Sequence, residues 1–247
     1  MEYPLSCRLP SSPPTLPDNE VHVWRAGLEL EPADYNQLEK VLSSDEQARA
    51  LRFRFVRDRH HFIAGRAILR QILATYLDRQ PSQLQFCYGP YGKPSLVTGS
   101  EPRGLSFNLS HSHGLALYAV TRQREIGIDL EQLRSDFPCE QVADRFFSSR
   151  EISKLRSMAD SMRHEAFFNC WTRKEAYIKA RGDGLGFPLE RFDVSLAPEE
   201  PAALLNTEDD PQEALRWSLA QLAPVAGYAA ALAVKGHGWQ LETWQWH

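Results

Sequence analysis

The order in which periodic segments follow one another constrains this fold more than any single motif. Helical patterns between Pro32 and Asp78 lead into short strand patterns. A second group of helices, ending with a long one over about residues 162–181, leads into strands again. Helices followed by strands twice over predict an α+β fold of two similar, pseudo-symmetric lobes, each with helices packed on a small, mostly antiparallel sheet. We expect the active site in the cleft between the lobes.

The predicted boundaries divide the chain into a lead-in and two lobes. Residues 1–19 contain five prolines and indicate an extended lead-in, residues 20–124 form the N-terminal lobe, and residues 125–247 form the C-terminal lobe. Within this scheme "LALYAV" and "EIGIDLE" are expected to form a hairpin across "TRQR", and the polar residues 197–213 are expected to form a loop.

The composition is that of a globular protein without a general affinity for polyanions. With 43% hydrophobic residues the chain can bury a core, and a formal net charge of −4 gives its surface no bias towards nucleic acid or an anionic membrane. No apolar run approaches the roughly 20 residues that span a bilayer, and the first residues lack the basic start and apolar centre of a signal peptide. We therefore expect a cytoplasmic protein with no nucleic-acid or membrane partner.

The strand pattern "EIGIDLE" carries two acidic residues on one face. Side chains alternate along a strand, so Asp129 and Glu131 point the same way as Gly127, while the apolar residues between them point the other way. Their Cα atoms would lie about 6.6 Å apart, close enough for the carboxylates to repel unless a cation lies between them. A hard divalent cation, Mg²⁺ in first place, would bind there; a solvated outer strand face explains two acids equally well.

A second candidate group lies on the predicted helix over about residues 162–181. Trp171, Glu175 and Lys179 follow one another at intervals of four and therefore line one helical face. A Glu four residues before a Lys is also the common helix ion pair, which contributes about 0.2–0.5 kcal/mol and needs no function. The rest of this helix is largely apolar, however, and charges on an apolar helix need partners.

Three other segments indicate anion binding. The pattern "FNLSHSHG" places Ser110 and His111 at the end of a strand, where side chains and backbone N–H groups can reach an anion, and Lys93 lies in the turn "YGKP". A basic cluster spans residues 49–70, and guanidinium groups bind phosphate bidentately. Its arginines are Arg49, Arg52, Arg54, Arg57, Arg59, Arg66 and Arg70. Together with the acids, these cations indicate phosphoryl-group chemistry on an anionic cofactor.

Five segments occur in an order that resembles a known enzyme family. "YGKP", "FNLSHS", "GIDLE", "RFFSSRE" and "WTRKEAYIKARGDGLGFPL" together look like the signature of the 4′-phosphopantetheinyl transferases of the surfactin-synthetase-activating (Sfp) type, over about residues 45–195. The resemblance implies Mg²⁺-dependent transfer of the 4′-phosphopantetheine arm of coenzyme A to a serine hydroxyl of an apo acyl or peptidyl carrier protein, with release of adenosine 3′,5′-bisphosphate. The chain length is similar to that of the two-lobed class, which implies a monomer.

The resemblance also implies a role for each matching residue of the acidic site. Asp129, Glu131 and Glu175 match the family's metal ligands, for Mg²⁺ or alternatively Mn²⁺. Glu175 also matches the general base that deprotonates the carrier serine, either directly or through a metal-bound water, and both routes stay open. Lys179 matches the lysine that contacts the cofactor pyrophosphate and can protonate the leaving group.

The remaining matches concern binding of the cofactor. Ser110 and His111 match residues at the phosphates, and Lys93 matches the lysine of the family's Gly-Lys-Pro turn. For the 3′-phosphate the resemblance favours Arg57 first and Arg49 second. Arg66 is the third candidate.

Two other functions would use the same residues. A metal-dependent phosphohydrolase or nuclease would use the acids and arginines to activate water, and it would release phosphate or nucleotide without a carrier. A non-catalytic coenzyme A or carrier-protein binding module would use the acids only as structure. Such a module would need no base beside a metal.

Overall fold

The computed structural model describes residues 2–5, 14–97 and 104–246. Its helices are α1 (Pro32–Glu39), α2 (Ser44–Ala50), α3 (Val56–Leu77), α4 (Cys139–Phe146), α5 (Ser149–Ser157) and α6 (Asp160–Arg181). The longer strands are β2 (Glu20–Gly27), β5 (Leu105–Ser112), β6 (Leu115–Arg122), β7 (Ile126–Gln132), β10 (Trp217–Ala223), β11 (Tyr228–Lys235) and β12 (Gln240–Gln245). The short strands are β1 (Glu2–Pro4), β3 (Phe86–Tyr88), β4 (Pro94–Leu96), β8 (Phe192–Val194) and β9 (Leu204–Thr207).

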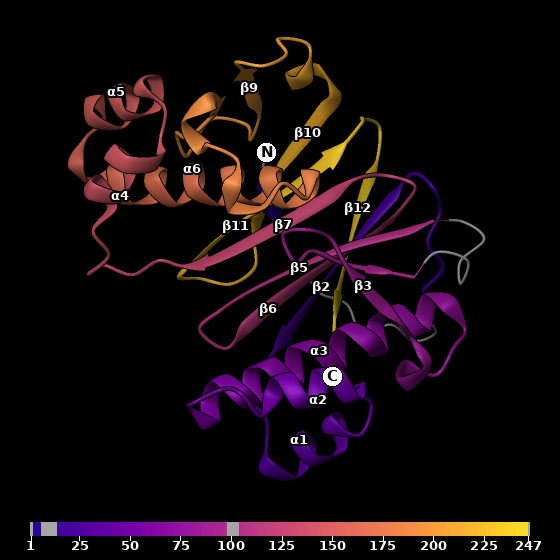
Figure 1. Ribbon diagram of the computed structural model, residues 1–247. Helices are drawn as coiled ribbons and strands as arrows, with labels where there is room; N and C mark the ends of the chain where they lie inside the picture. Colours follow the sequence, from indigo (N-terminus) through magenta and orange to yellow (C-terminus); the bar gives the residue numbers. More distant parts are fainter. Residues whose placement is uncertain (1, 6–13, 98–103, 247) are drawn as a thin grey trace.

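Two four-stranded sheets lie between two groups of helices, as Figure 1 shows. The strand orders are β12-β2-β6-β5 in one sheet and β1-β10-β11-β7 in the other, and most neighbours are antiparallel. Two small hairpins, β3-β4 and β8-β9, stand beside these sheets. The predicted α+β architecture, with helices on small and mostly antiparallel sheets in two lobes, is confirmed.

Three apolar cores hold the layers together. Helices α1 to α3 cover the outer face of the first sheet in a core that includes Trp24 and Ile68. Helices α4 to α6 cover the outer face of the second sheet in a core that includes Tyr177. The inner faces of the two sheets meet in a third core that includes Val23 and Ile128. The lobes are therefore joined by continuous apolar packing, face to face.

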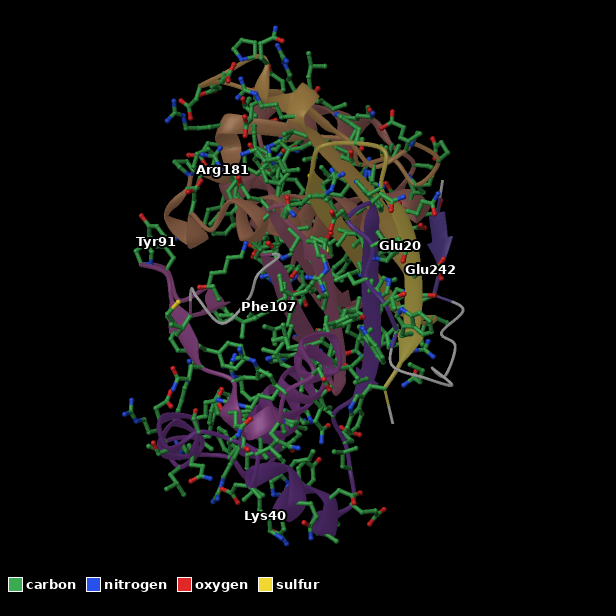
Figure 2. The ribbon with its side chains drawn as sticks, turned by 90° about the vertical axis from the view of Figure 1, so that its right-hand side faces the viewer. Glu20, Lys40, Tyr91, Phe107, Arg181 and Glu242 are labelled. Carbon is green, nitrogen blue, oxygen red and sulfur yellow. The ribbon has the colours of Figure 1, made fainter. Side chains whose placement is uncertain are left out.

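Each end of the chain adds a strand to the sheet of the other lobe. Strand β12 pairs in parallel with β2 in the first sheet, and Glu242 lies opposite His22; Figure 2 shows Glu20 and Glu242 on these neighbouring strands. Strand β1 pairs in parallel with β10 in the second sheet, and Leu5 continues this pairing by donating its N–H to the carbonyl of Ala223. Figure 1 accordingly shows each terminus inside the lobe formed by the opposite half of the chain.

Two local expectations need correction. Strand β6 forms its hairpin with β5, through a turn in which His113 and Gly114 have positive φ, and β7 instead pairs with β11 in the other sheet. The predicted hairpin across residues 121–124 is therefore wrong, because this segment carries the chain from one sheet to the other. Residues 197–213 were expected to form a loop, but they contain the strand β9. The extended lead-in contributes β1, and its residues 6–13 lie outside the described part of the chain.

The helix boundaries follow from local capping. Ser148 and Glu151 form a capping box at the start of α5, with Glu151 Oε2 accepting from the Ser148 N–H at 2.9 Å. Ser43 and Glu46 cap α2 in the same way. Helix α6 ends at Gly182, whose φ of +80° is the left-handed conformation that suits glycine after a helix. None of the helices that the structure describes is both long and apolar enough to cross a membrane.

Candidate active site

The two acids of β7 lie under helix α6. A Cβ on Gly127 would stand 2.1 Å from the carbonyl oxygen of Ala176 and 2.4 Å from the backbone nitrogen of Ala180, so only glycine lets the helix approach this strand so closely. Gly127 shares its strand face with Asp129 and Glu131, which confirms the predicted alternation. Asp129 is only 2% exposed, so the alternative of a solvated outer face is wrong for this residue.

Lys179, Asp129 and Ser110 form a connected group at the junction of the lobes. Lys179 Nζ lies 2.5 Å from Asp129 Oδ1 and donates to Ser110 Oγ at 3.1 Å. Ser110 Oγ in turn donates to Asp129 Oδ1 at 3.0 Å. Because Ser110 comes from β5, Asp129 from β7 and Lys179 from α6, the group exists only when both lobes are packed together.

Two carboxylates at this junction have raised pKa values. Burial in first place, together with the nearby charges of Asp129 and Glu131, raises the pKa of Glu175 to about 7 against the opposing effect of Lys179. Burial and the charge of Asp129 also raise the pKa of Glu131. The carboxylates of Asp129, Glu131 and Glu175 therefore lie within electrostatic range of one another. The spacing along β7 predicted this for Asp129 and Glu131, but no spacing could predict it for Glu175, which lies on α6.

Two carboxylate oxygens of this group are buried without a hydrogen-bond partner. They are Asp129 Oδ2 and Glu175 Oε1. A buried anionic oxygen without a partner is costly, so both atoms fit a bound cation. Within the described residues, however, no three His, Cys, Asp or Glu side chains are gathered as a formed metal site. The cation that faces Asp129 in this arrangement is Lys179.

A line of basic side chains leads from this group towards α3. The pKa of His111 is lowered by burial, by Lys179 and by His61, so these three groups lie near one another. The pKa of His61 is lowered by burial and, among nearby charges, by Arg57, while Glu29 opposes the effect. Arg57 stands one turn before His61 on α3 and its side chain is 77% exposed. Because the pKa values of both histidines are lowered, the positive charge of this line lies at its two ends, on Lys179 and Arg57. His61 has no signal in the sequence that separates it from its neighbour His60.

The structure gives different surroundings to the arginines of the basic cluster at residues 49–70. Arg49 is exposed, and its guanidinium lies 5.3 Å from the ring centroid of Phe62. Arg66 is buried and donates to Glu46 Oε1 at 2.8 Å and to the Tyr88 hydroxyl at 3.0 Å. Arg70 holds the other oxygen of Glu46 at 2.6 Å. Arg66 therefore has a sufficient structural role in this buried ion group.

Lys93 joins the two lobes through backbone carbonyls. Its ammonium donates to Ile126 O at 3.1 Å, at the start of β7, and to Ala180 O at 2.8 Å, near the end of α6. Burial lowers the pKa of Lys93 to about 8. The "YGKP" turn is thereby anchored to both elements that carry the acids.

The same turn also packs on the loop that follows α6. A Cβ on Gly184, whose φ is +63°, would stand 2.5 Å from the Cβ of Tyr91, so the glycine makes room for this tyrosine. Figure 2 shows Tyr91 at the edge of the molecule, on the side where Arg181 ends α6. A pocket of about 190 Å³ lies between the turn and the helix, and Lys93, Asn108 and Lys179 are among its lining residues.

Two charged residues of the motif "WTRKE" serve the interior of the C-terminal lobe. Lys174 is fully buried, pairs with Glu151 Oε2 at 2.8 Å and donates to the carbonyls of Leu189 and Phe192. Arg173 is also buried and donates to the carbonyl of Ser195 at 2.7 Å. Burial and hydrogen-bond partners distinguish these cations from Lys179, and neither can be read from the motif.

Known proteins match the chain along most of its length. The family model described as 4′-phosphopantetheinyl transferase superfamily matches residues 125–233, and the model described as 4′-phosphopantetheinyl transferase, N-terminal, matches residues 29–123. The 4′-phosphopantetheinyl transferase HetI of Nostoc sp. is 47% identical over 232 residues, which are 94% of each chain. A putative 4′-phosphopantetheinyl transferase of Synechocystis sp. is 37% identical and covers 72% of this chain and 71% of its own.

A third relative is the 4′-phosphopantetheinyl transferase Sfp of Bacillus subtilis, which is 31% identical over 63% of this chain and 66% of its own. The alternative of a non-catalytic binding module is set aside, because these relatives are named as enzymes. This chain belongs to the 4′-phosphopantetheinyl transferase superfamily and is an enzyme that transfers phosphopantetheine to carrier proteins.

Proposed function

We propose that this enzyme is of the two-lobed Sfp type, that it uses Mg²⁺, and that its reaction takes place where Ser110, Asp129 and Lys179 meet. The observation that carries the proposal is the contact of these three residues across both lobes, with Glu175 beside them. The Sfp type is supported by the order of the five motifs, while the overall identity to HetI is higher.

The proposed reaction forms one P–O bond and breaks another. The Oγ atom of the carrier serine attacks the phosphorus that bears the pantetheine arm, and the bond from this phosphorus to the departing adenosine 3′,5′-bisphosphate breaks. Glu175 accepts the proton of the serine hydroxyl. Lys179 lies beside the leaving phosphate, where its ammonium offsets the negative charge that develops and can give the leaving oxygen a proton.

Asp129, Glu131 and Glu175 are the residues that would hold the metal ion. The unpartnered oxygens of Asp129 and Glu175 support this assignment, because each needs a cation nearby. When bound, Mg²⁺ or Mn²⁺ supplies neutralisation of pyrophosphate charge. Ser110 keeps the other oxygen of Asp129 fixed by a hydrogen bond, which leaves the unpartnered oxygen free for the ion.

The basic side chains are proposed to hold the cofactor along the line described above. Ser110 and His111 would bind its phosphates, and Arg57 would bind the 3′-phosphate, with Arg49 as the second candidate. Lys93 would line the cofactor pocket while its ammonium stays bound to carbonyl groups. Arg66 stays the third candidate, because its Nε and Nη2 groups are bound to Glu46 and Tyr88.

The remaining predictions concern the whole molecule. The extensive core between the sheets supports the proposal that residues 20–124 and 125–247 act as one rigid monomer. Strand β1 also pairs in the sheet of the C-terminal lobe, and strand β12 pairs in the sheet of the N-terminal lobe. A cytoplasmic location stays a prediction from the sequence.

Intact-mass spectrometry of an apo carrier protein tests the proposal. The carrier is incubated with the enzyme, coenzyme A and Mg²⁺, and parallel samples contain a chelator or a chelator with excess Mn²⁺. We expect the carrier to gain the mass of one phosphopantetheine arm in the sample with Mg²⁺. This mass gain should be absent in the sample with chelator and present again in the sample with chelator and excess Mn²⁺. Transfer that is equally fast in chelator would contradict the metal site, and hydrolysis of coenzyme A without a mass gain would favour a phosphohydrolase.

A further inference from the structure

Side chains of β5 take the place of a backbone partner along one edge of β7. The two strands lie at the edges of different sheets, and no backbone pairing joins them in the described part of the chain. Three side chains at alternate positions of β5 instead accept hydrogen bonds from three backbone N–H groups at alternate positions of β7. The bonds are Ile128 N–H to Asn108 Oδ1 (2.9 Å), Leu130 N–H to Ser110 Oγ (3.3 Å) and Gln132 N–H to Ser112 Oγ (3.2 Å).

This side-chain ladder fixes the register between the lobes. Each bond joins residues that are 20 positions apart, so a shift of β7 by one or two residues would break all of them together. The acids lie between the ladder positions, because Asp129 and Glu131 alternate with the residues whose N–H groups are bound. The ladder therefore sets where both carboxylates stand relative to β5.

Ser112 has a second contact that ties the ladder to one of the acids. Its hydroxyl donates to Glu131 Oε2 at 3.1 Å while it accepts from the N–H of Gln132. His113 Nδ1 lies 3.2 Å from the same hydroxyl. A serine hydroxyl has one proton to give and two lone pairs to accept with, so the bound N–H group directs the proton of Ser112 towards the carboxylate.

Ser110 makes the equivalent pair of contacts with Leu130 and Asp129, but it also contacts Lys179. Ser112 makes no contact with Lys179 and is 8% exposed. Glu131 is half-buried, and without Ser112 its flexible side chain would be free to turn towards solvent. Replacing Ser110 would disturb both Asp129 and Lys179. Replacing Ser112 would disturb only one charged residue of the site, Glu131.

We propose that Ser112 is a positioning residue, which holds the Glu131 carboxylate beside Asp129 in the orientation needed for metal binding. The inference rests on the proposed function, since it assumes that Glu131 is a metal ligand. Partners that orient a ligand from behind typically change metal affinity or activity by about 10- to 100-fold when they are removed.

Binding of Mn²⁺, followed by electron paramagnetic resonance on the full-length protein, tests the proposal without any turnover. Ser112→Ala is expected to weaken Mn²⁺ binding by about 10-fold, and to raise the Mg²⁺ concentration for half-maximal transfer more than it lowers kcat at saturating Mg²⁺. Ser112→Thr keeps a hydroxyl and is expected to restore most of the affinity. Ser106→Ala is the matched control, because Ser106 lies on the same face of β5 and has no hydrogen bond to β7 among the described residues.

Hydrogen exchange tests the ladder itself in the metal-free protein. The amide of Gln132 is expected to exchange faster in Ser112→Ala than in the wild type or in Ser106→Ala, because its acceptor is lost. Unchanged exchange, or unchanged Mn²⁺ affinity in Ser112→Ala, would overturn the role of Ser112.

Asp129→Ala separates this failure from failure of the proposed function. If the wild type binds Mn²⁺ and Asp129→Ala does not, the metal site stands whatever Ser112→Ala does. If both bind Mn²⁺ equally, the proposed metal site is wrong and the role of Ser112 falls with it.

Discussion

Lys179 Nζ and Asp129 Oδ1 lie 2.5 Å apart, and their side chains are 30% and 3% exposed. The pair joins the last turns of α6 to the middle of β7, where Gly127 lets the helix backbone come close. A buried carboxylate needs such a partner, while the more exposed ammonium can still reach a ligand. The pair therefore connects the packing of the C-terminal lobe to the chemistry of its site.

Glu175→Gln is expected to lower kcat for transfer by about 10²–10⁴-fold, the usual contribution of a general base. The amide keeps the size of the side chain but accepts no proton, so the thermal unfolding temperature should change little. Single-turnover transfer to an apo carrier, followed by intact mass, measures the effect. Glu165→Gln, at an exposed position of the same helix, is the control and should transfer as the wild type does. A kcat within twofold of the wild type in Glu175→Gln would remove Glu175 from the role of base.

Arg57→Ala is expected to raise the KM for coenzyme A about 10-fold and to leave the KM for 3′-dephospho-coenzyme A unchanged, because only the 3′-phosphate would lose a charged partner. Initial rates with both substrates measure the difference. Arg150→Ala serves as the control, since Arg150 is equally exposed at 78% but lies on α5 of the other lobe. Equal losses on both substrates in Arg57→Ala would place the 3′-phosphate elsewhere, with Arg49 as the next residue to change.

Glu46→Gln is expected to reduce the free energy of unfolding by about 3–5 kcal/mol, because it leaves the buried charges of Arg66 and Arg70 without their partner. Chemical denaturation at neutral pH measures the loss. Glu39→Gln is the control, since the pair of Glu39 with Arg59 is partly exposed and should contribute less than about 1 kcal/mol. A similar loss in both variants would contradict a special role for the buried group.

The same buried group predicts a pH dependence of stability. Burial alone would raise the pKa of Glu46, but Arg66 and Arg70 outweigh it and hold the pKa below its ordinary value of 4.5. As the pH falls from 4.5 through the lowered pKa, the unfolded chain binds a proton that the folded chain does not, and stability decreases. The stability difference between wild type and Glu46→Gln should therefore narrow in this window, as denaturation at a series of pH values would show. A constant difference would exclude Glu46 as the titrating group.

Gly184→Ala is expected to lower stability by about 1–3 kcal/mol from backbone strain alone, because its φ of +63° disfavours any residue with a Cβ. The added methyl group would also meet Tyr91. In a Tyr91→Gly background the loss should be smaller, since the Cβ and ring atoms that the methyl group would meet are gone while the strain remains. A double-mutant cycle of unfolding free energies measures this coupling. Additive losses would show that Tyr91 does not press on the glycine.

Much of the local structure could be predicted from residues close in sequence. The end of α6 at Gly182 and the capping boxes at Ser43 and Ser148 follow from local hydrogen bonds and backbone preference. The common face of Asp129 and Glu131 follows from strand alternation. These features need no information about distant parts of the chain.

The pairing of strands and the burial of charged side chains could not be predicted from the sequence in the same way, because both depend on residues that lie far apart along the chain. The alternating patterns on either side of residues 121–124 suited a hairpin, yet β6 and β7 belong to different sheets. An alternating pattern predicts which face of a strand is buried, but it does not predict which other strand pairs with it. Arg57 and Arg66 likewise look alike in the sequence, although one is exposed and the other is buried against Glu46.

The sequence by itself determined the α+β class, the helix ends, the strand face that carries Asp129 and Glu131, and the motif order that resembles the transferase family, because periodicity, caps and motifs are properties of short segments. The tertiary structure alone decided that the chain ends exchange between lobes, that Lys179 rather than Lys174 faces Asp129, and that Ser112 faces Glu131. These relationships arise from the packing of two sheets and α6, which brings together residues that no local pattern connects.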